Sequence, residues 1–217
     1  MSFKAAIFDL DGVLVNTVPL HFKAWKKMFN EYGKEFNFED YKQKVDGIPR
    51  LDGAMAILTG LPIDELEKAA AKKQGYYLEL IKQEGVEAYQ TSADLIKELK
   101  EHGIKIAVIS SSRNCHLILE KANLLNLIDI EISGNDITKG KPDPQIFLMA
   151  LERLGIKASE GIVFEDAVLG VEAAKRAKIV TVGIDRHKDP RSLSKANLVV
   201  EDLSEVNFNK LNKMLSQ

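Results

Sequence analysis

The chain has 217 residues, enough for one sizeable core or for a core with a small insert. Hydrophobic residues make up 45% of the sequence and charged residues 29%, which is ordinary for a soluble globular protein. The 30 basic and 32 acidic residues give a formal net charge of -2, which argues against a broad basic surface for nucleic acid or for an anionic membrane.

Cys115 is the only cysteine, so no internal disulfide can form. Residues 1–10 lack the basic start and the long apolar run of a signal peptide. No apolar stretch of the sequence approaches the length of a membrane span. We therefore expect a cytoplasmic protein with no nucleic-acid or membrane partner, and we further expect a monomer.

The first predicted element is a buried strand, because the apolar run Ala5–Phe8 stops abruptly at Asp9. Backbone alternation directs Asp9 and Asp11 to one side of the chain, and Gly12 lets the chain turn there. Two carboxylates this close raise the pKa of at least one of them unless a cation lies between them. For this short pattern alone, the alternative is a strand end followed by acidic loop residues.

Residues 15–88 contain no clear strand and are predicted to form a helical block inserted after the first strand. The first helix of the block is indicated by aromatic residues at helical spacing, closed by Gly33: Phe22, Trp25, Phe29 and Tyr32. Further helices are predicted over Arg50–Leu58 and Ile63–Ile81, separated by a Gly-Leu-Pro turn. The block must begin and end near one edge of the sheet, so it can act as a lid. We assign Trp25 to the core of this block, with a sugar-stacking role as the alternative.

The rest of the chain alternates between apolar runs and helical patterns. Strands are predicted over Ile104–Ile109, Ile128–Ile132, Gly161–Phe164, Ile179–Ile184 and Leu198–Val200. Helices are predicted over Ala93–Glu101, Cys115–Ala122, Pro144–Leu154 and Val168–Ala177. This alternation predicts an α/β fold: a Rossmann-like parallel sheet covered on both faces, formed by residues 1–14 and 89–217, with residues 15–88 as an inserted helical cap.

A second acidic pair, Glu165-Asp166, follows the predicted strand Gly161–Phe164. If this strand lies beside the first one, four carboxyl groups converge at the carboxyl edge of the sheet. Oxygen ligands of this kind suit Mg²⁺, which keeps several waters and binds substrate phosphate. Capping of the following helix is the alternative for Glu165 and Asp166 taken alone.

Two further strand ends carry groups that can bind phosphate. The strand over Ile104–Ile109 leads into Ser110-Ser111-Ser112-Arg113-Asn114, whose hydroxyls and backbone amides can hold phosphate oxygens or can simply cap a helix. Lys141 precedes a proline-initiated helix and is either a phosphate ligand or a solvated surface lysine. No P-loop or dinucleotide-binding glycine motif is present in the sequence.

Four motifs in chain order resemble those of the haloacid dehalogenase superfamily: Asp9-Leu10-Asp11-Gly12-Val13, Ser110, Lys141 and Glu165-Asp166. The resemblance covers essentially the whole chain and includes a helical cap inserted after the first motif. It implies that Asp9 is a nucleophile and Asp11 a general acid/base. It also implies that Ser110 and Lys141 bind the transferring phosphoryl group.

The same resemblance implies a magnesium site. Asp9, Asp166 and the backbone carbonyl of Asp11 would hold Mg²⁺, and Glu165 would support these ligands. A carboxylate nucleophile would split phosphoryl transfer into two steps through an aspartyl-phosphate. Asp11 would protonate the leaving oxygen and later accept a proton from the attacking hydroxyl.

Within the superfamily, the beginning of the chain resembles the β-phosphoglucomutase family. The matching residues are Asn16-Thr17, His21-Phe22 and Ala24-Trp25, after the first motif. By this resemblance Thr17 lies at the hinge of the cap, and His21 helps to orient the acid/base Asp11. A purely structural histidine is the alternative for His21.

The resemblance extends to a cap loop with Gly47 and Arg50, where the arginine grips the distal phosphate, and to Lys73 and Gln74, which would face the sugar. The substrate loop is matched with arginine in place of the usual lysine, in the order Ser112, Arg113 and Asn114. Asp46 stands where the best-known members carry lysine. This difference leaves the sugar specificity open but does not affect the phosphoryl chemistry.

We therefore predict a magnesium-dependent enzyme that transfers phosphoryl groups on a small phosphorylated sugar through an aspartyl-phosphate at Asp9. The leading expectation is a β-phosphoglucomutase-type enzyme that converts β-glucose 1-phosphate to glucose 6-phosphate. The alternative is a sugar-phosphate phosphatase, which differs only in what attacks the phosphoaspartate. A non-catalytic phosphate-binding module is disfavoured because all the catalytic side chains are present.

Overall fold

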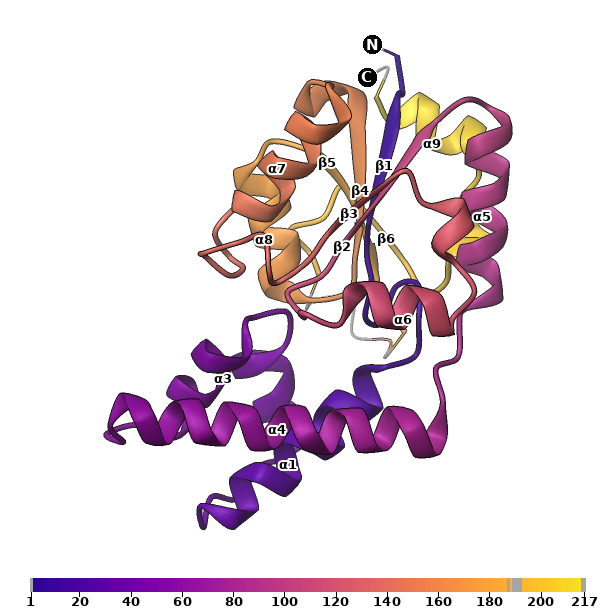
Figure 1. The fold of residues 1–217 in the computed structure, drawn as a ribbon. Helices are drawn as coiled ribbons and strands as arrows, with labels where there is room; N and C mark the ends of the chain where they lie inside the picture. Colours follow the sequence, from indigo (N-terminus) through magenta and orange to yellow (C-terminus); the bar gives the residue numbers. More distant parts are fainter. Residues whose placement is uncertain (1, 187, 189–192, 216–217) are drawn as a thin grey trace.

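The computed structural model describes residues 2–186, 188 and 193–215. Its core is a six-stranded parallel sheet in the order β3-β2-β1-β4-β5-β6 (Figure 1). The strands are β1 (Ala5–Asp9), β2 (Lys105–Ile109), β3 (Ile130–Ile132), β4 (Gly161–Glu165), β5 (Val180–Ile184) and β6 (Leu198–Val200). The predicted α/β fold with a helical insert between β1 and β2 is therefore confirmed.

Helices cover both faces of the sheet, which explains why its central strands are apolar at almost every position. In β1, Ala6 and Phe8 belong to the hydrophobic cluster on one face, and Ala5 and Ile7 belong to the cluster on the other. The first face is covered by α5 (Gln90–Glu101), α6 (Cys115–Lys121) and α9 (Phe208–Met214). The second face is covered by α7 (Gln145–Leu154) and α8 (Val168–Arg176). Short 3-10 turns complete the core at Leu125–Leu127, Ala158–Glu160 and Leu203–Glu205.

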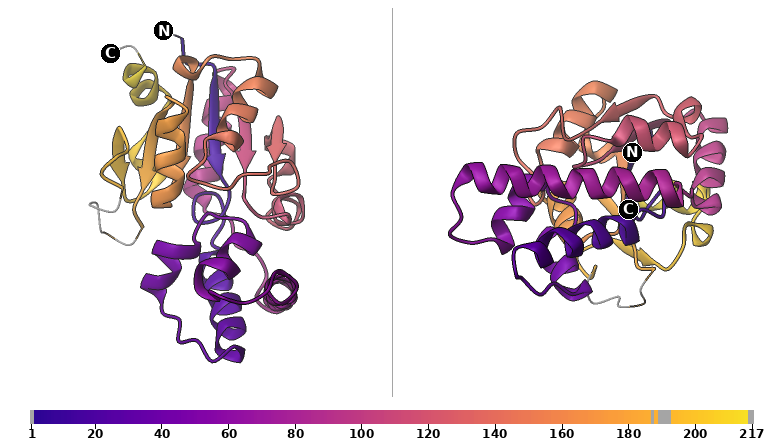
Figure 2. Two further views of the ribbon diagram at one scale, coloured as in Figure 1. Left: turned by 90° about the vertical axis from the view of Figure 1, so that its left-hand side faces the viewer. Right: turned by 60° about the horizontal axis from the view of Figure 1, so that its bottom comes forward.

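The insert is helical and has its own hydrophobic cluster. It contains α1 (Val18–Glu31), α2 (Phe38–Asp40), a π-helical turn (Tyr41–Val45), α3 (Arg50–Ile57) and α4 (Ile63–Glu84). Trp25 stacks on Phe29 with 5.1 Å between ring centroids, and both side chains are buried in this cluster. Helices α1 and α4 pack side by side below the carboxyl ends of the strands, at the end of the molecule opposite the two termini (Figures 1 and 2).

Two chain segments connect the core with the insert, and they run side by side. The Asn16 N–H donates a hydrogen bond to the Glu87 carbonyl over 2.8 Å, and the Tyr89 N–H donates to the Leu14 carbonyl over 2.9 Å. Val15 also forms an isolated bridge with Ala88. We propose the boundaries at this crossing, with residues 1–14 and 89–217 as core and 15–88 as cap.

Most predicted elements agree with the structure to within a few residues. The helix predicted over Ile63–Ile81 continues to Glu84, because Gly85, with φ of 79°, is the residue that ends it. The strand predicted from Ile128 begins only at Ile130, after a 3-10 turn. The turn at Tyr41–Val45 and helix α9 were not predicted, because both are too short to show a clear period. Among the described residues, no helix is long and apolar enough to cross a membrane.

Candidate active site

Three strand ends bring the predicted catalytic residues together. Asp9 ends β1, Ser110 follows β2, and Glu165 ends β4. Because β1 pairs in parallel with both β2 and β4, these residues meet at the carboxyl edge of the sheet. The loop between β3 and α7 adds Lys141. Strand pairing thus unites four positions that are separated by up to 156 residues, from 9 to 165.

Lys141 is a buried cation that bridges two carboxylates. Its Nζ donates hydrogen bonds to Asp9 Oδ1 over 2.6 Å and to Glu165 Oε1 over 2.5 Å. Burial would lower the pKa of Lys141, but the charges of Asp9 and Glu165 raise it above its ordinary value. The lysine therefore stays protonated, and the alternative of a solvated surface lysine does not apply to this buried side chain.

Asp9, Glu165 and Asp166 form a compact cluster in which one carboxylate oxygen of each residue lies within 4.8 Å of the others. Burial raises the pKa of Asp9 well above its ordinary value, and Glu165 raises it further, against the lowering effect of Lys141. Burial also raises the pKa of Asp166, again with a contribution from nearby carboxylates. The single ammonium of Lys141 therefore does not neutralise the negative charge of the three carboxylates.

The cluster fits a hard divalent cation. All its donors are carboxylate oxygens, which Mg²⁺ prefers, and a cation would relieve the repulsion among them. Gly12 makes room for the cluster: its φ is 81°, and a Cβ there would lie 1.9 Å from Asp166 Oδ2. Gly170 does the same for Glu165, since a Cβ would lie 1.3 Å from Glu165 Oε1.

The Asp11 carboxylate lies outside this cluster and points to the cap. Its oxygens accept hydrogen bonds from the Thr17 hydroxyl, from His21 Nε2 at 3.2 Å and from Ser110 Oγ at 3.2 Å. Burial would raise the pKa of Asp11, but His21 and the three hydrogen bonds lower it to about 2. The sequence grouped Asp11 with the metal ligands through its backbone carbonyl, and its side chain is free for a different role.

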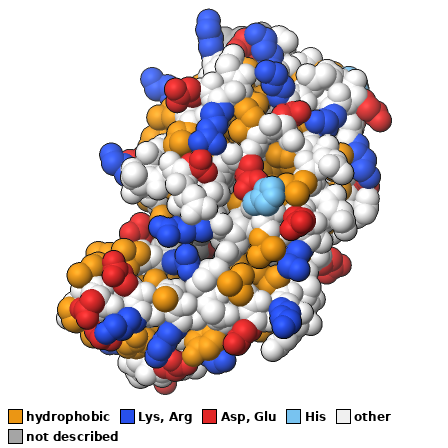
Figure 3. All heavy atoms as spheres, in the orientation of Figure 1, with side chains coloured by type: hydrophobic (Ala, Val, Ile, Leu, Met, Phe, Trp, Pro, Cys, Tyr) orange, Lys and Arg blue, Asp and Glu red, His pale blue; other side chains and the backbone are white. Residues whose placement is uncertain are grey.

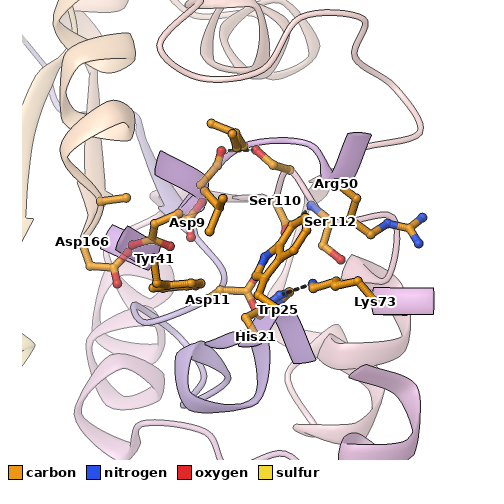
Figure 4. Close-up of a pocket in the computed structure, with 16 residues that line it drawn as sticks. Asp9, Asp11, His21, Trp25, Tyr41, Arg50, Lys73, Ser110, Ser112 and Asp166 are labelled. Atoms are coloured by element: carbon orange, nitrogen blue, oxygen red, sulfur yellow. Dashed lines mark hydrogen bonds and ion pairs between the residues drawn. The ribbon is translucent and has the colours of Figure 1, made fainter. Parts of the chain in front are cut away.

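A chain of polar contacts leads from Asp11 into the cap. His21 contacts Asp11 through Nε2, and its Nδ1 lies 2.8 Å from Lys73 Nζ, as the dashed line in Figure 4 shows. Burial and the charge of Lys73 lower the pKa of His21. Because the Asp11 carboxylate can only accept, Nε2 carries a hydrogen, and Nδ1 faces Lys73 Nζ. His21 also stacks on Tyr77 with a centroid distance of 4.0 Å.

The opposite side of the cavity is cationic. Figure 4 shows Asp9 and Asp166 on one side and Arg50 and Lys73 on the other. Burial and the charge of Arg113 lower the pKa of Arg50, and burial and the charge of Arg50 lower the pKa of Lys73 to about 7. No ion pair is found for these three cations within the described part of the chain. Basic side chains are also visible where the core meets the cap in Figure 3.

Gln74 and Asn114, both expected at the substrate, bond to each other across the junction between cap and core. Gln74 Nε2 donates to Asn114 Oδ1 over 2.8 Å, and Asn114 Nδ2 donates back to Gln74 Oε1 over 3.2 Å. Asn114 Nδ2 also donates to Ser112 Oγ over 3.2 Å. These side chains therefore tie α4 to the loop after β2, on the side of the cavity where Arg50 lies.

The cap loop Asp46–Arg50 is docked directly on the core. Ser111 Oγ donates to the Gly47 carbonyl over 2.6 Å. Pro49 packs on Gly140 so closely that a Cβ on Gly140 would lie 2.1 Å from Pro49 Cδ. The cavity between the cap loop and the core has a volume of about 50 Å³ in this position of the cap.

Seven of the described residues that line this cavity were not among the predicted site residues: Trp25, Tyr41, Val45, Asp46, Ile48, Ser111 and Ala167. Trp25, assigned to the cap core, is buried and also borders the cavity. Ser111 could have been found from its position between Ser110 and Ser112 after a strand. Tyr41 lies in the unpredicted π-helical turn, so no period in the sequence pointed to it.

The fold and the clustered motifs define a haloacid dehalogenase-type enzyme core with a helical cap. A sequence profile described as haloacid dehalogenase-like hydrolase matches residues 6–184, and the chain belongs to this family. The predicted resemblance is therefore confirmed, and the chain is a phosphotransferase or phosphatase of this family. Within the family it is similar to the β-phosphoglucomutase-like members that carry a helical cap.

Individual relatives fall into two activities. A phosphorylated carbohydrates phosphatase from Thermotoga maritima is 35% identical over 184 residues, which cover 81% of this chain and 82% of the relative. A β-phosphoglucomutase from Mycobacterium bovis is 32% identical over 238 residues, with 94% and 91% covered. A crystal structure of β-phosphoglucomutase from Clostridium difficile superposes with a TM-score of 0.90 at 27% identity, covering 99% of this chain and 97% of that one.

Proposed function

We propose that the chain transfers phosphoryl groups on a small phosphorylated sugar through an aspartyl-phosphate at Asp9, and that it is a mutase of the β-phosphoglucomutase type. Its reaction would convert β-glucose 1-phosphate to glucose 6-phosphate. The observation that carries this proposal is the pair of basic side chains, Arg50 and Lys73, that lines the cavity on the side opposite the nucleophile. The phosphate of a monophosphate occupies the end of the cavity at Asp9. Only a substrate with a second anionic group also binds at the end where Arg50 lies.

Asp9 is the proposed nucleophile because it is the carboxylate at the end of β1 held by Lys141 at 2.6 Å. Attack of its oxygen on the phosphorus atom forms an acyl phosphate and releases the substrate oxygen. Lys141 and the Ser110 hydroxyl are proposed to bind the oxygens of the transferring group, which is supported by their contacts with Asp9 and Asp11. In the second half-reaction, a sugar hydroxyl attacks the same phosphorus and regenerates the Asp9 carboxylate.

Asp11 is the proposed general acid/base. With its pKa at about 2, the carboxylate holds no proton while Thr17, His21 and Ser110 all donate to it. To protonate a leaving oxygen it has to give up some of these bonds and turn toward the substrate. We propose that movement of the cap about Thr17 changes these contacts, since both Thr17 and His21 lie on the cap side of the crossing.

Asp9, Asp166 and the backbone carbonyl of Asp11 are proposed to hold Mg²⁺, with Glu165 supporting the site. When bound there, Mg²⁺ would neutralise phosphate charge so that the anionic Asp9 can approach it. Glu165 fixes the local geometry by accepting from Lys141 Nζ and from the Asp166 N–H, the latter at 3.2 Å.

The cap is proposed to supply the sugar contacts. Gly47 and Lys73 line the cavity from the cap, and Ser112 lines it from the core. Gln74 and Asn114 bond to each other and do not line the cavity, and Arg113 does not line it either, so their contact with the sugar is proposed for a different position of the cap. Arg50 can grip a phosphate in a bidentate manner at the end remote from Asp9. Closure would also keep water from the phosphoaspartate until a sugar hydroxyl attacks. We further propose that the enzyme acts on free sugar phosphates as a monomer.

A sugar-phosphate phosphatase is the second candidate. It is supported by the 35% identical phosphatase of phosphorylated carbohydrates and by Asp46, which places a carboxylate where the resemblance leads one to expect lysine. In that case water would attack the phosphoaspartate, and Asp9, Asp11 and Lys141 would keep the roles given above.

The test is product analysis with β-glucose 1-phosphate and a trace of glucose 1,6-bisphosphate. A mutase gives glucose 6-phosphate much faster than inorganic phosphate. Arg50→Ala should then reduce isomerisation on the order of 10²-fold and reduce hydrolysis of p-nitrophenyl phosphate far less, because that compound has no second phosphate. Arg176→Ala, which removes an exposed arginine paired with Glu172, is the matched control. Inorganic phosphate as the main product, with equal effects of Arg50→Ala on both reactions, would assign the phosphatase.

A further inference from the structure

Asp46 brings a fourth carboxylate to the catalytic cavity, and it does so from the cap. It follows the π-helical turn Tyr41–Val45 and lines the same cavity as Asp9 and Asp166. The neighbouring Gly47 fixes its position relative to the core, since a Cβ on Gly47 would lie 3.4 Å from Ala167 Cβ and 3.5 Å from Lys141 Cδ. Asp46 therefore sits above the strand ends that hold the acidic cluster.

Tyr41 lies beside Asp46 in the wall of the cavity. The Asp46 N–H donates a hydrogen bond to the Tyr41 carbonyl over 3.0 Å, and the tyrosine ring is buried in the hydrophobic cluster of the cap. Burial and the nearby Asp46 carboxylate raise the pKa of Tyr41 well above its ordinary value. Its ring stacks on Phe38 at 5.7 Å between centroids, so the hydroxyl has little freedom. Within the described part of the chain, Asp46 forms no ion pair, and in particular none with Arg50.

The charges around Asp46 do not balance. With the cap closed, Asp46 lines the same cavity as Asp9, Asp11 and Asp166, and the Lys141 ammonium is already paired with Asp9 and Glu165. Burial and repulsion from Asp46 raise the pKa of Asp166 and of Glu165, and burial together with repulsion from Asp9 raises the pKa of Asp46 to about 7. In a partly desolvated site, each such repulsion opposes closure, because the open cap moves Asp46 away from the other three.

We propose that Asp46 couples closure of the cap to a divalent cation in the core site: the cap carrying this carboxylate closes readily only when the cation is bound. The inference rests on the magnesium dependence proposed above but not on the identity of the sugar. Asp46 is thus a positioning residue, which acts through the electrostatics of the closed state. With the cation bound, the Asp46 carboxylate is attracted to the core site. Without the cation, it is repelled by the core carboxylates.

The sign of the charge at this position decides the direction of the coupling. A neutral side chain at position 46 removes the repulsion, so the cap closes without a cation. The linkage between closure and cation binding is reciprocal. If the cation no longer favours closure, closure no longer strengthens binding of the cation, so the core site binds the cation less tightly. With a carboxylate at position 46, the affinity for the cation therefore depends on the position of the cap, and the position of the cap depends on the cation.

The coupling can be measured without any sugar or turnover. Calorimetric titration gives the Mg²⁺ affinity, and small-angle X-ray scattering gives the radius of gyration with and without Mg²⁺. Trp25, the single tryptophan of the chain, borders the cavity and provides a second signal for closure through its emission. The variants are Asp46→Asn, which keeps the shape, and Tyr41→Phe, which removes only the hydroxyl of the residue beside Asp46 in the cavity wall. Asp64→Asn removes the same charge from an exposed site of the cap and is the control.

We expect Mg²⁺ to compact the natural protein and the Asp64→Asn control alike. Asp46→Asn should already be compact in EDTA and should bind Mg²⁺ on the order of tenfold more weakly. Tyr41→Phe should shift both quantities in the same direction by less. Natural Mg²⁺ affinity in Asp46→Asn, or a radius that responds to Mg²⁺ as in the natural protein, would overturn the proposal. Absence of Mg²⁺ binding by the natural protein would instead overturn the proposed cofactor.

Discussion

The Ser111 hydroxyl of the core donates a hydrogen bond to the Gly47 carbonyl of the cap over 2.6 Å. Two residues further along the cap loop, Pro49 lies against Gly140, and the amide pair of Gln74 and Asn114 closes the other side of the junction. The closed state is therefore held by direct contacts between cap and core. Opening of the cap would break these contacts, so substitutions there should change closure with little effect on folding.

Gly140→Ala tests this junction most directly. The added Cβ would lie 2.1 Å from Pro49 Cδ, a ring atom that cannot rotate away, but it meets this atom only when the cap is closed. We expect kcat/KM for the sugar phosphate to fall on the order of 10²-fold while the Tm changes little. Gly75→Ala, whose Cβ would meet nothing within 4 Å, is the control. Unchanged kcat/KM in Gly140→Ala would show that closure does not need this contact.

Asp9→Asn should abolish turnover while preserving the fold. Asparagine keeps the shape but loses the negative charge required for attack and for the cation site. We expect kcat to fall roughly 10⁴-fold, as for removal of a covalent nucleophile. The repulsion from Glu165 disappears, so the Tm in EDTA should not decrease. The measurements are steady-state kinetics and acid-quench detection of the phosphoenzyme; near-natural turnover would rule out the aspartyl-phosphate route.

Removal of the divalent cation should stop turnover reversibly. EDTA should abolish activity and Mg²⁺ should restore it, whereas Ca²⁺ should inhibit because it takes more ligands at longer distances. Asp166→Ala removes one of the three clustered carboxylates and should raise the Mg²⁺ concentration needed for half-maximal activity. Full activity in EDTA would exclude the cluster of Asp9, Glu165 and Asp166 as a metal site.

Lys73 should make stability depend on pH above neutrality. Burial, together with the charge of Arg50, lowers the pKa of this 1% exposed lysine from 10.5 to about 7. Between these two values the unfolded chain holds a proton that the folded protein has lost, so the free energy of unfolding rises with pH across this window. Lys73→Met lacks this titration. Its stability relative to the natural protein should be highest near pH 6, by roughly 2–4 kcal/mol, and should decline toward pH 10.

Urea unfolding at pH 6 and pH 9.5 measures this difference. Lys72→Met is the control, because Lys72 is exposed on the same helix and its pKa is raised by Glu31 instead of lowered. Equal stability differences at both pH values for Lys73→Met would mean that Lys73 titrates in its ordinary range. Loss of the contact between Lys73 and His21 should separately reduce activity, since His21 would no longer be held against Asp11.

The end of each central strand could be predicted from local patterns. Ala5–Asp9 and Gly161–Glu165 are uninterrupted apolar runs that stop at carboxylates, and only a strand buried on both faces selects such a run. Given parallel pairing, Asp9 and Glu165 had to meet, because parallel strands end at the same edge. Lys141 could be placed only through its motif, because its position depends on a loop without a period of its own.

Contacts between cap and core were decided by the tertiary structure alone. Whether Asp46 opposes a phosphate or orients Arg50 could not be derived from their spacing of four residues. In the structure Asp46 lines the cavity with Asp9, Asp166 and Tyr41, and within the described part of the chain it forms no ion pair with Arg50. The pairing of Gln74 with Asn114 was likewise hidden, because it joins two elements that meet only when the helical insert folds over the sheet. Local sequence determines strands, helices and their polar ends through backbone geometry and burial. The partner of a cap side chain depends instead on how two separately packed cores dock, and no short stretch of sequence encodes that.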